Sequence, residues 1–499
     1  MTDVFRTALL NAVAAGGEAV AVIDDHAAVR YRTLERWSAD LARLLPGPHQ
    51  DGSPAPRCAL LLPNSAAWLA AYLAALRAGL LVAPLNIALT DTEVTRVLVH
   101  SHIDVLLCPP ERAADLHRLT AERRLRTRVL PVASAPPHDA GGGGGSAVPG
   151  PWPHSRAGAA CLLMHTSGTT GTPKAVVQTE QALALTTAYW SSRHRRPHDT
   201  VALVLPLAHT YGHLAATATL LAGGCTVLSG RPFDADHWAH LVRRHRVSVI
   251  EGPPAVYIRL LANGTDLPGL RECLTGGQQP PPGLPDAWRT RYGVALREAW
   301  GMTELSGPGL DASLGACPGS AGLPVPGLEV QVTNPSDGLV ANEGEVGELR
   351  VRGREVTPGR DEDGRTEPLT DALGWLHTGD LARADAHGCV TIVGRSKDVI
   401  LTNGYTVHPA EIEQALFRHP DVQDAAAIGL PDPQRGEAVH AVLVVRPGAR
   451  TTPEEVLHHC RQYLARYKIP RTLHFARALP LSPTGKVDRT ALRAGLPTP

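Results

Sequence analysis

The chain has 499 residues, of which 43% are hydrophobic and 19% charged, and its 48 basic and 48 acidic side chains cancel. A chain of this length is expected to form two or more domains, and this apolar content is ordinary for a globular protein. The balanced charge argues against nucleic acid or an anionic membrane as the main partner, which leaves a small-molecule enzyme as the expectation.

Targeting and membrane signals are weak. The start, MTDVFRTALLNAVAAGG, carries an acid and one arginine before a short apolar stretch, which predicts no secretory signal. The longest apolar span, residues 58–85, is interrupted by Pro63, Asn64 and Arg77, so it predicts a strand, a turn and a buried helix rather than a membrane span. Eight scattered cysteines without a CxxC pair favour neither a disulfide framework nor a zinc site. We therefore expect a cytoplasmic protein.

Apolar runs alternate with helical stretches along the first four fifths of the chain. The runs at 201–208 and 247–252 read as strands, whereas 90–101 and 234–245 read as helices, a pattern typical of βα units in an α/β fold. Two helix starts are predicted by the capping-box pairs Thr90 with Glu93 and Thr452 with Glu455. The glycine-rich segment 131–156 predicts a flexible loop inside the large domain.

Lysine is rare in this sequence. Only four of the 48 basic residues are lysines, and they are Lys174, Lys397, Lys468 and Lys486. Arginine replaces a lysine poorly where a compact, mobile ammonium must follow a phosphate charge, so retained lysines indicate function, with chance retention under a codon bias as the alternative.

The segment HTSGTTGTPK, residues 165–174, predicts a phosphate-binding loop. Gly168 and Gly171 allow positive φ and close approach of backbone N–H groups to an anion. The hydroxyl donors of this loop are Thr166, Ser167, Thr169 and Thr170. The spacing G-x-x-G-x-x-K differs from the P-loop pattern, so a Walker-type NTPase is not supported, and a plain turn is the alternative for the bare pattern.

The string TSGTTGTPKAV resembles the phosphate loop of the adenylate-forming superfamily of acyl-CoA synthetases, peptide-synthetase adenylation domains and luciferases. The resemblance continues in order through LPLAHTYGH, LTGGQQPP, EAWGMTELSG, GEVGELRVRG, GWLHTGDLAR, VGRSKDVILTNGYTVHPAEIE and LSPTGKVDR. It covers nearly the whole chain from residue 30 onward. It implies a large α/β domain with βαβ-type sheets and a small β-barrel (1–394), a hinge (395–398) and a small, mobile α+β lid domain (399–499).

The resemblance also implies ATP and Mg²⁺ as cofactors. Thr166 to Thr170, Gly171 and Lys174 would hold the β- and γ-phosphates, Thr303 would touch the α-phosphate and Glu304 would hold Mg²⁺. Trp300 stands where the family has tyrosine and would stack on adenine, while Asp380 and Arg395 would bind the ribose hydroxyls. The remaining implied nucleotide contacts are Gly276, Gly277, Gln278 and Gly301.

Three further roles follow from the resemblance. Lys486 would be the catalytic residue that reaches both the attacking carboxylate and the α-phosphate; no general base is needed, because a carboxylate is already ionised at neutral pH. Lys397 would be the hinge about which the lid rotates between half-reactions. His209 would gate the acid pocket, and because HTYGH lacks the glutamate of H-E-x-x-H, metal ligation by His209 and His213 is not favoured.

The residues of the acid pocket are implied only by their positions in the motifs that resemble the family. Its expected residues are His209, Thr210, Val256, Tyr257, Gly277, Met302 and Ser306. Thr210 stands where amino-acid-activating domains place an aspartate, so an amino acid substrate is disfavoured, and the mixed polar set favours an aryl or short acyl acid. Arg360, where the family has tyrosine, puts contacts to the thiol partner in doubt.

We therefore predict an AMP-forming ligase that converts an acid and ATP to acyl-AMP and pyrophosphate and then transfers the acyl group to a thiol, with CoA as the expected co-substrate. The alternatives are a ligase that loads a separate carrier protein, an adenylating enzyme for an unusual oxyacid such as nitrite, and a non-catalytic adenylate-binding homologue. The sequence leaves the acid, the pathway and the oligomeric state open.

Overall fold

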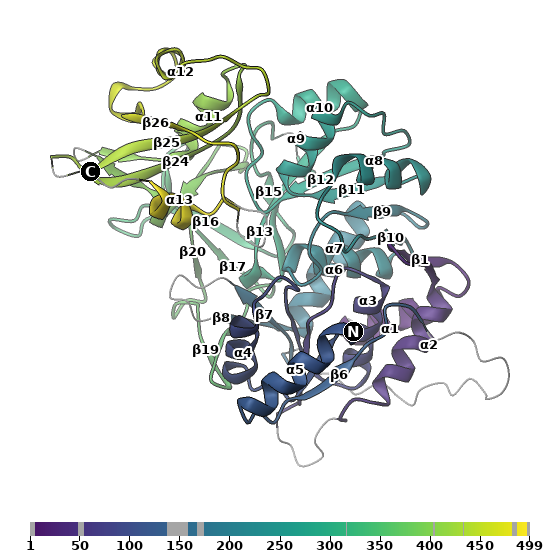
Figure 1. The fold of residues 1–499 in the computed structure, drawn as a ribbon. Helices are drawn as coiled ribbons and strands as arrows, with labels where there is room; N and C mark the ends of the chain where they lie inside the picture. The colour runs from purple at the N-terminus through teal and green to yellow at the C-terminus, as the bar shows by residue number, and fades with distance from the viewer. Residues whose placement is uncertain are drawn as a thin grey trace.

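The computed structural model describes residues 5–47, 54–136, 158–166, 174–315, 317–402, 405–432, 434–481 and 487–496. At Thr166, Lys174 and Thr406 only the main chain is described. Most of the glycine-rich segment 131–156 lies outside these ranges. The chain is a mixed α/β protein with four sheets (Figure 1), which confirms the predicted fold class.

The first sheet has nine strands in the described residues, and its six central strands, β13 to β1 in spatial order, are parallel. In spatial order they are β15 (Leu323–Pro324), β14 (Gly307–Asp311), β13 (Leu296–Met302), β12 (Glu272–Gly276), β11 (Val249–Gly252), β9 (Thr200–Leu203), β10 (Cys225–Val227), β1 (Val20–Ile23) and β2 (Ala28–Arg30). The carboxyl ends of the parallel strands therefore meet at one edge, where α/β proteins place their ligands.

The second sheet, as far as the structure describes the chain, has eight strands in the order β19 (Arg365–Glu367), β18 (Gly359–Glu362), β8 (Lys174–Thr179), β7 (Ala160–Thr166), β4 (Leu81–Pro84), β3 (Arg57–Leu60), β5 (Val105–Cys108) and β6 (Arg128–Pro131). Strands β7 to β6 are parallel, and β8, β18 and β19 are added antiparallel. Strands β4 and β5 are buried along their whole length, as expected for parallel strands covered on both faces.

Helices form three layers around these two sheets. The bounds are α1 (Phe5–Ala15), α2 (Tyr31–Ala42), α3 (Ala66–Arg77), α4 (Asp91–His100), α5 (Pro110–Glu122), α6 (Glu180–His194), α7 (Thr210–Leu221), α8 (Ala235–Arg244), α9 (Pro254–Asn263) and α10 (Leu284–Tyr292). The main apolar core joins α1, α2, α3, α6 and α7 to both sheets, so these five helices are sandwiched between them. Helices α4 and α5 cover the outer face of the eight-stranded sheet, and α8, α9 and α10 that of the nine-stranded sheet.

The predicted span at 58–85 is strand β3, the wholly buried helix α3 and strand β4. Within the part of the chain that the structure describes, no helix is long and apolar enough to cross a bilayer. The capping boxes at Thr90 and Thr452 are both present, which confirms the two predicted helix starts.

The third sheet is antiparallel, with the order β16 (Glu329–Thr333), β17 (Gly347–Arg352), β20 (Leu376–Ala384) and β21 (Val390–Arg395). The resemblance implied a small β-barrel within residues 1–394, and in the described residues this sheet is an open one of four strands. The short helix η2 (Ser396–Asp398) follows β21 and leads into the C-terminal part.

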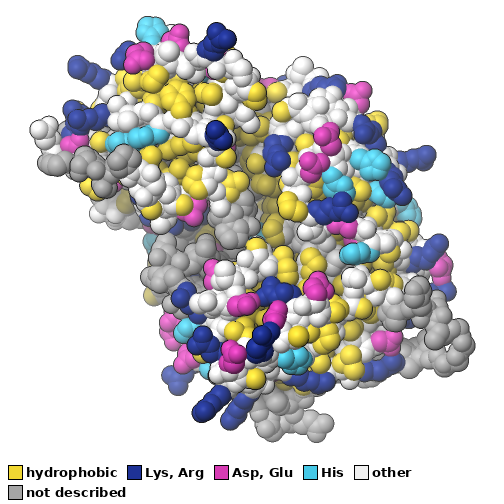
Figure 2. All heavy atoms as spheres, in the orientation of Figure 1, with side chains coloured by type: hydrophobic (Ala, Val, Ile, Leu, Met, Phe, Trp, Pro, Cys, Tyr) yellow, Lys and Arg dark blue, Asp and Glu magenta, His cyan; other side chains and the backbone are white. Residues whose placement is uncertain are grey.

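The described residues of the C-terminal part form their own five-stranded sheet and core. Its elements are β22 (Ile400–Thr402), β23 (Tyr405–Val407), α11 (Pro409–Phe417), β24 (Val422–Asp432), β25 (Gly436–Val445), α12 (Pro453–Cys460), η3 (Arg466–Lys468), β26 (Thr472–Phe475) and α13 (Arg489–Gly495). In Figure 1 this lobe lies apart from the N-terminal helices. On the face drawn in Figure 2, basic and acidic side chains are interspersed, in keeping with the zero net charge.

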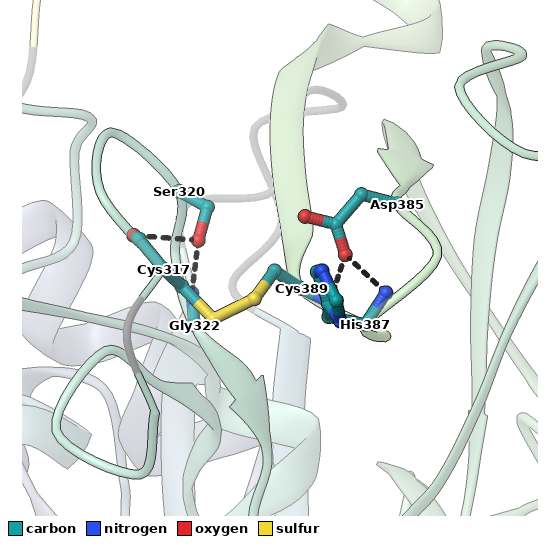
Figure 3. Close-up of a disulfide and its surroundings, with 6 residues drawn as sticks. All are labelled: Cys317, Ser320, Gly322, Asp385, His387 and Cys389. Carbon is teal, nitrogen blue, oxygen red and sulfur yellow. Dashed lines mark hydrogen bonds between the residues drawn. A yellow bond between two sulfur atoms is a disulfide. The ribbon is translucent and has the colours of Figure 1, made fainter.

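One disulfide corrects the prediction from the sequence. Cys317 and Cys389 are bonded across a separation of 72 residues, with their Cα atoms 5.8 Å apart, and join the loop before β15 to the start of β21 (Figure 3). The backbone bridge between Gly322 and Val390 runs beside it. Scattered single cysteines carry no spacing signal for such a pair, because the fold alone brings them together. The other six cysteines are free.

We expect the double variant Cys317→Ser/Cys389→Ser to lower the free energy of unfolding by about 4 kcal/mol, since a cross-link over a loop of this length restricts the unfolded chain. The free energy of unfolding is measured by urea titration without added oxidant or reductant. Cys225→Ser is the control, because it removes a free, half-buried thiol. Wild-type midpoints that are identical with and without dithiothreitol would contradict this expectation.

Candidate active site

Strands β7 and β8 frame the predicted phosphate loop. They are antiparallel neighbours, and their register pairs Thr166 with Lys174, so the segment between them leaves and re-enters the sheet at the same point. The predicted phosphate contacts Ser167, Gly168, Thr169, Thr170 and Gly171 lie outside the described residues, as do the side chains of Thr166 and Lys174 and the whole of Lys486.

Gln178 is a site residue that the sequence analysis missed. It is fully buried on β8, and its Nε2 donates to the carbonyl oxygen of Thr303 at 2.8 Å and to Oγ1 of Thr210 at 3.4 Å. Its Oε1 is buried without a hydrogen-bond partner among the described residues. The side chain thus ties the phosphate-loop strand to the segment at Thr303 and to the start of α7. A lone amide in the apolar run AVVQT was the one available signal.

The three residues expected around adenine and ribose lie together. Trp300 on β13 donates its indole Nε1 to Oδ2 of Asp380 at 2.9 Å, and Arg395 pairs with Oδ1 of the same carboxylate. Asp380 and Arg395 are cross-strand partners on β20 and β21, which explains why two distant motifs meet. The Asp380 side chain is only 4% exposed. A carboxylate has about four lone-pair sites, so a group in this position can accept several hydrogen bonds at once.

Glu304 lies in the short helix η1 (Thr303–Leu305), directly after Trp300 and its strand. Its carbonyl oxygen accepts from the N–H of Thr357 at 2.7 Å, and its Oε1 lies 3.5 Å from Nη2 of Arg360. The carboxylate is 13% exposed, so it keeps access to solvent. Arg360 is therefore paired with the predicted metal ligand.

The donor set at Glu304 fits Mg²⁺. No group of three or more potential ligands from His, Cys, Asp and Glu occurs among the described residues, so the protein part of the site is no all-protein cage. That suits Mg²⁺, which proteins usually hold by one or two carboxylates together with substrate phosphates and water.

Two glycines near this point are required by packing. A Cβ on Gly276 would lie 2.7 Å from the carbonyl oxygen of Ala299 and 3.3 Å from the ring of Tyr211. A Cβ on Gly301 would lie 2.3 Å from the carbonyl oxygen of Gly307, at the irregular pairing of β13 with β14. The chain following Gly276 continues through Gly277, at φ +80°, to Gln278 at the carboxyl end of β12.

The predicted pocket residues on α7 and after η1 lie close to this edge. His209 is the N-cap of α7, and its Nδ1 accepts from the N–H of Tyr211 at 3.3 Å. Thr210 is buried beside Gln178. Ser306 is 1% exposed and its Oγ has no hydrogen-bond partner in the described part, while Met302 is half-buried at the end of β13.

Val256 and Tyr257 belong to the core on the outer face of the nine-stranded sheet. The Tyr257 hydroxyl donates to the carbonyl oxygens of Ile250 and Leu274 at 2.8 and 2.7 Å, and its ring packs edge-on against Trp288. The hydroxyl of Tyr257 is thus engaged by the sheet.

Tyr211 and Trp190 occupy the space behind Gly276, and the sequence analysis missed both. Their rings meet edge-to-face with centroids 6.2 Å apart. Trp190 donates its Nε1 to Glu251 at 3.1 Å, and Glu251 is paired with Arg195, both side chains being wholly buried. Burial raises the pKa of the Tyr211 hydroxyl, and the nearby Glu251 carboxylate raises it further. The rings form a fixed wall behind the glycine.

The two remaining lysines have clear positions. Lys397 lies exposed in η2, between β21 and β22. Lys468 forms an ion pair with Glu411, and its Nζ lies 5.7 Å from the centroid of Tyr467, whose ring stacks on Tyr405. Lys468 is therefore explained by packing within the C-terminal lobe.

Two family models match the chain. Residues 9–359 match the model described as AMP-binding enzyme, and residues 411–486 match the AMP-binding enzyme C-terminal domain. These matches cover more than half of the chain.

Curated relatives and solved structures agree with these models. The chain is 35% identical over 448 residues to a sulfoacetate–CoA ligase of Cupriavidus necator, covering 86% of both chains. It is 35% identical over 490 residues to a feruloyl-CoA synthase of an Amycolatopsis species, covering 95% of both. The ATP-bound structure of MatB from Rhodopseudomonas palustris superposes with a TM-score of 0.86 at 28% identity, over 97% of this chain and 98% of that one.

Proposed function

The chain belongs to the AMP-binding enzyme family and is an AMP-forming acid–thiol ligase, and from this premise we propose that it activates a short or aryl carboxylic acid with ATP and transfers the acyl group to CoA. The observation that supports the nucleotide site is the meeting of Trp300, Asp380 and Arg395, because three separate motifs supply one site and Glu304 follows Trp300 in the first of them.

The first half-reaction joins the acid to the nucleotide. An oxygen of the acid's carboxylate attacks the α-phosphorus of ATP, the bond to the β-phosphate oxygen breaks, and pyrophosphate leaves. Lys486 would stabilise the negative charge that develops at the α-phosphate, and Thr303 would hold that phosphate in line. Asp380 would accept the ribose hydroxyls and so fix the nucleotide's position. Mg²⁺, held by Glu304 and the phosphates, would neutralise part of the pyrophosphate charge.

The second half-reaction uses the same pocket. The sulfur of the thiol attacks the acyl carbon, the acyl–phosphate bond breaks, and AMP leaves. We place the moving boundary at residues 395–398, between a large domain (1–394) and a lid (399–499), with exposed Lys397 as the hinge. His209 would change position at the pocket entrance between the two steps.

The acid class is inferred from the wall behind Gly276. Tyr211 and Trp190 close the space next to the acid site, and the buried Glu251–Arg195 pair anchors Trp190. Such a closed end suits a short or a flat aryl acid better than a long chain. The names of the two relatives, for sulfoacetate and feruloyl substrates, fall within that range.

We propose a cytoplasmic location, where ATP and CoA are both supplied. The Cys317–Cys389 disulfide is the feature that counts against it, because disulfides persist mainly in oxidising compartments.

The acceptor is tested by supplying CoA or a phosphopantetheinylated carrier protein with a panel of short, aromatic, sulfonated and inorganic acids. Acyl-CoA detected by mass spectrometry supports the proposal. Acyl transfer to the carrier alone, adenylation of an inorganic oxyacid alone, or ATP binding without any pyrophosphate exchange would each contradict it.

We expect Tyr211→Ala to shift the acid preference toward larger acids. The value of kcat/KM for the best wild-type acid should fall about tenfold, because one pocket wall is lost, while that for an acid one ring longer rises. Tyr211→Phe is the matched control, since it keeps the ring and should keep the preference. An unchanged acid profile in Tyr211→Ala would contradict the assigned wall.

A further inference from the structure

Arg360 is a partly buried cation that the roles above leave unexplained. Its side chain is 29% exposed, and its pairing with Glu304 is long, at 3.5 Å between Nη2 and Oε1. Its Nε is buried with no hydrogen-bond partner among the described residues. A guanidinium has five N–H donors, and an unpaired buried donor costs free energy, so Arg360 has unused donor capacity at this site.

The main chain of Arg360 is held firmly. On β18 it is the cross-strand partner of Val176 in β8, the strand that begins where the phosphate loop ends. Nearby, Thr357 donates its N–H to the carbonyl of Glu304, and its hydroxyl donates to the carbonyls of Val177 and Gly359. Any adjustment at this point is therefore made by the long side chain rather than by the strand.

No other carboxylate is recorded on Arg360 in the described chain. Asp361 points to the opposite face of β18, because successive side chains of a strand alternate. There it is bound by both Nη atoms of Arg57, at 2.7 and 2.9 Å. Among the described residues, the carboxylate paired with Arg360 is therefore that of Glu304, at the long distance given above.

We propose, resting on the proposed function, that Arg360 is a further phosphate-binding residue. Its guanidinium lies on Glu304 in the nucleotide-free enzyme and turns to the β- and γ-phosphate oxygens when ATP arrives. Glu304 would hold Mg²⁺ through the carboxylate that Arg360 contacts, so the guanidinium would be free to turn when the metal–nucleotide complex is bound. A planar fork of donors matches phosphate oxygens, and β18, which carries Arg360, pairs with β8, the strand that begins at Lys174.

Binding of different nucleotides to the full chain tests this assignment without turnover. Affinities for AMP and for a non-hydrolysable ATP analogue, both with Mg²⁺, are measured by calorimetry for wild type, Arg360→Gln and Arg360→Lys. Arg365→Gln is the control, because Arg365 is exposed on the adjacent strand β19. Thermal unfolding of each variant shows that it is folded.

We expect Arg360→Gln to weaken binding of the ATP analogue about tenfold or more, as loss of charged hydrogen bonds does, and to leave AMP affinity within about twofold. Arg360→Lys should be intermediate, and Arg365→Gln should match wild type. Equal weakening of ATP and AMP, or no weakening of either, would overturn the assignment. These binding measurements need no acid substrate. A wild type that binds ATP but exchanges no pyrophosphate would contradict the proposed function, and the effect of Arg360→Gln on ATP and AMP affinity could still be compared.

Discussion

Lys486→Ala is expected to lower acid-dependent ATP–pyrophosphate exchange by roughly 10²- to 10³-fold while ATP binding survives, because it removes a positive charge aimed at the transition state. Lys486 would act in the adenylation step and not in thioester formation. When the acyl-AMP is supplied, the variant should therefore still form the thioester at a rate within a few-fold of wild type.

Lys468→Ala is the matched control for this experiment. It removes the same ammonium from the same lobe, but Lys468 is engaged by Glu411 within that lobe. Exchange should remain close to wild type, with a modest loss of thermal stability. If Lys486→Ala lost both half-reactions equally, the residue would be structural, and if it kept exchange, another group would be the catalytic cation.

Asp380→Asn is expected to weaken ATP binding by about 10²-fold. The substitution removes the negative charge that would accept two ribose hydroxyls, and each charged hydrogen bond contributes about 1.5 kcal/mol. It also leaves Arg395 without its partner. Titration of ATP into each protein measures the loss.

A ligand control separates recognition from folding. Wild type should bind 2′,3′-dideoxy-ATP about 10²-fold more weakly than ATP, whereas Asp380→Asn should bind the two nucleotides almost equally. Discrimination that persists in the variant would place the ribose contacts elsewhere. A general loss of structure would instead appear as a lower unfolding temperature without this loss of discrimination.

The fold class and the residues that belong to contiguous motifs could be predicted from the sequence. Trp300, Asp380 and Arg395 each lie in a contiguous motif, but only the fold brings them together: sheet register pairs Asp380 with Arg395, and Trp300 reaches Asp380 from another sheet. The capping boxes are also local, because both partners lie three residues apart. Features of this kind need no knowledge of tertiary contacts.

Features that depend on contacts between distant segments could not be predicted. Gln178 reaches Thr303 across 125 residues, and Cys317 reaches Cys389 across 72. The packing of Tyr257 is of the same kind, because its ring joins the core with Trp288 and its hydroxyl reaches two strands of the sheet. In the sequence, Arg360 stands out only because the family has tyrosine at this position. Its pairing with Glu304 is seen only in the structure.

The central claim is that an acid oxygen attacks the α-phosphorus of ATP. It is tested most directly with an acid labelled with ¹⁸O in its carboxylate, followed by mass spectrometry of the nucleotide and phosphate products after thioester formation. We predict that AMP gains one labelled oxygen and pyrophosphate gains none. Label in pyrophosphate or inorganic phosphate, with none in AMP, would contradict the account.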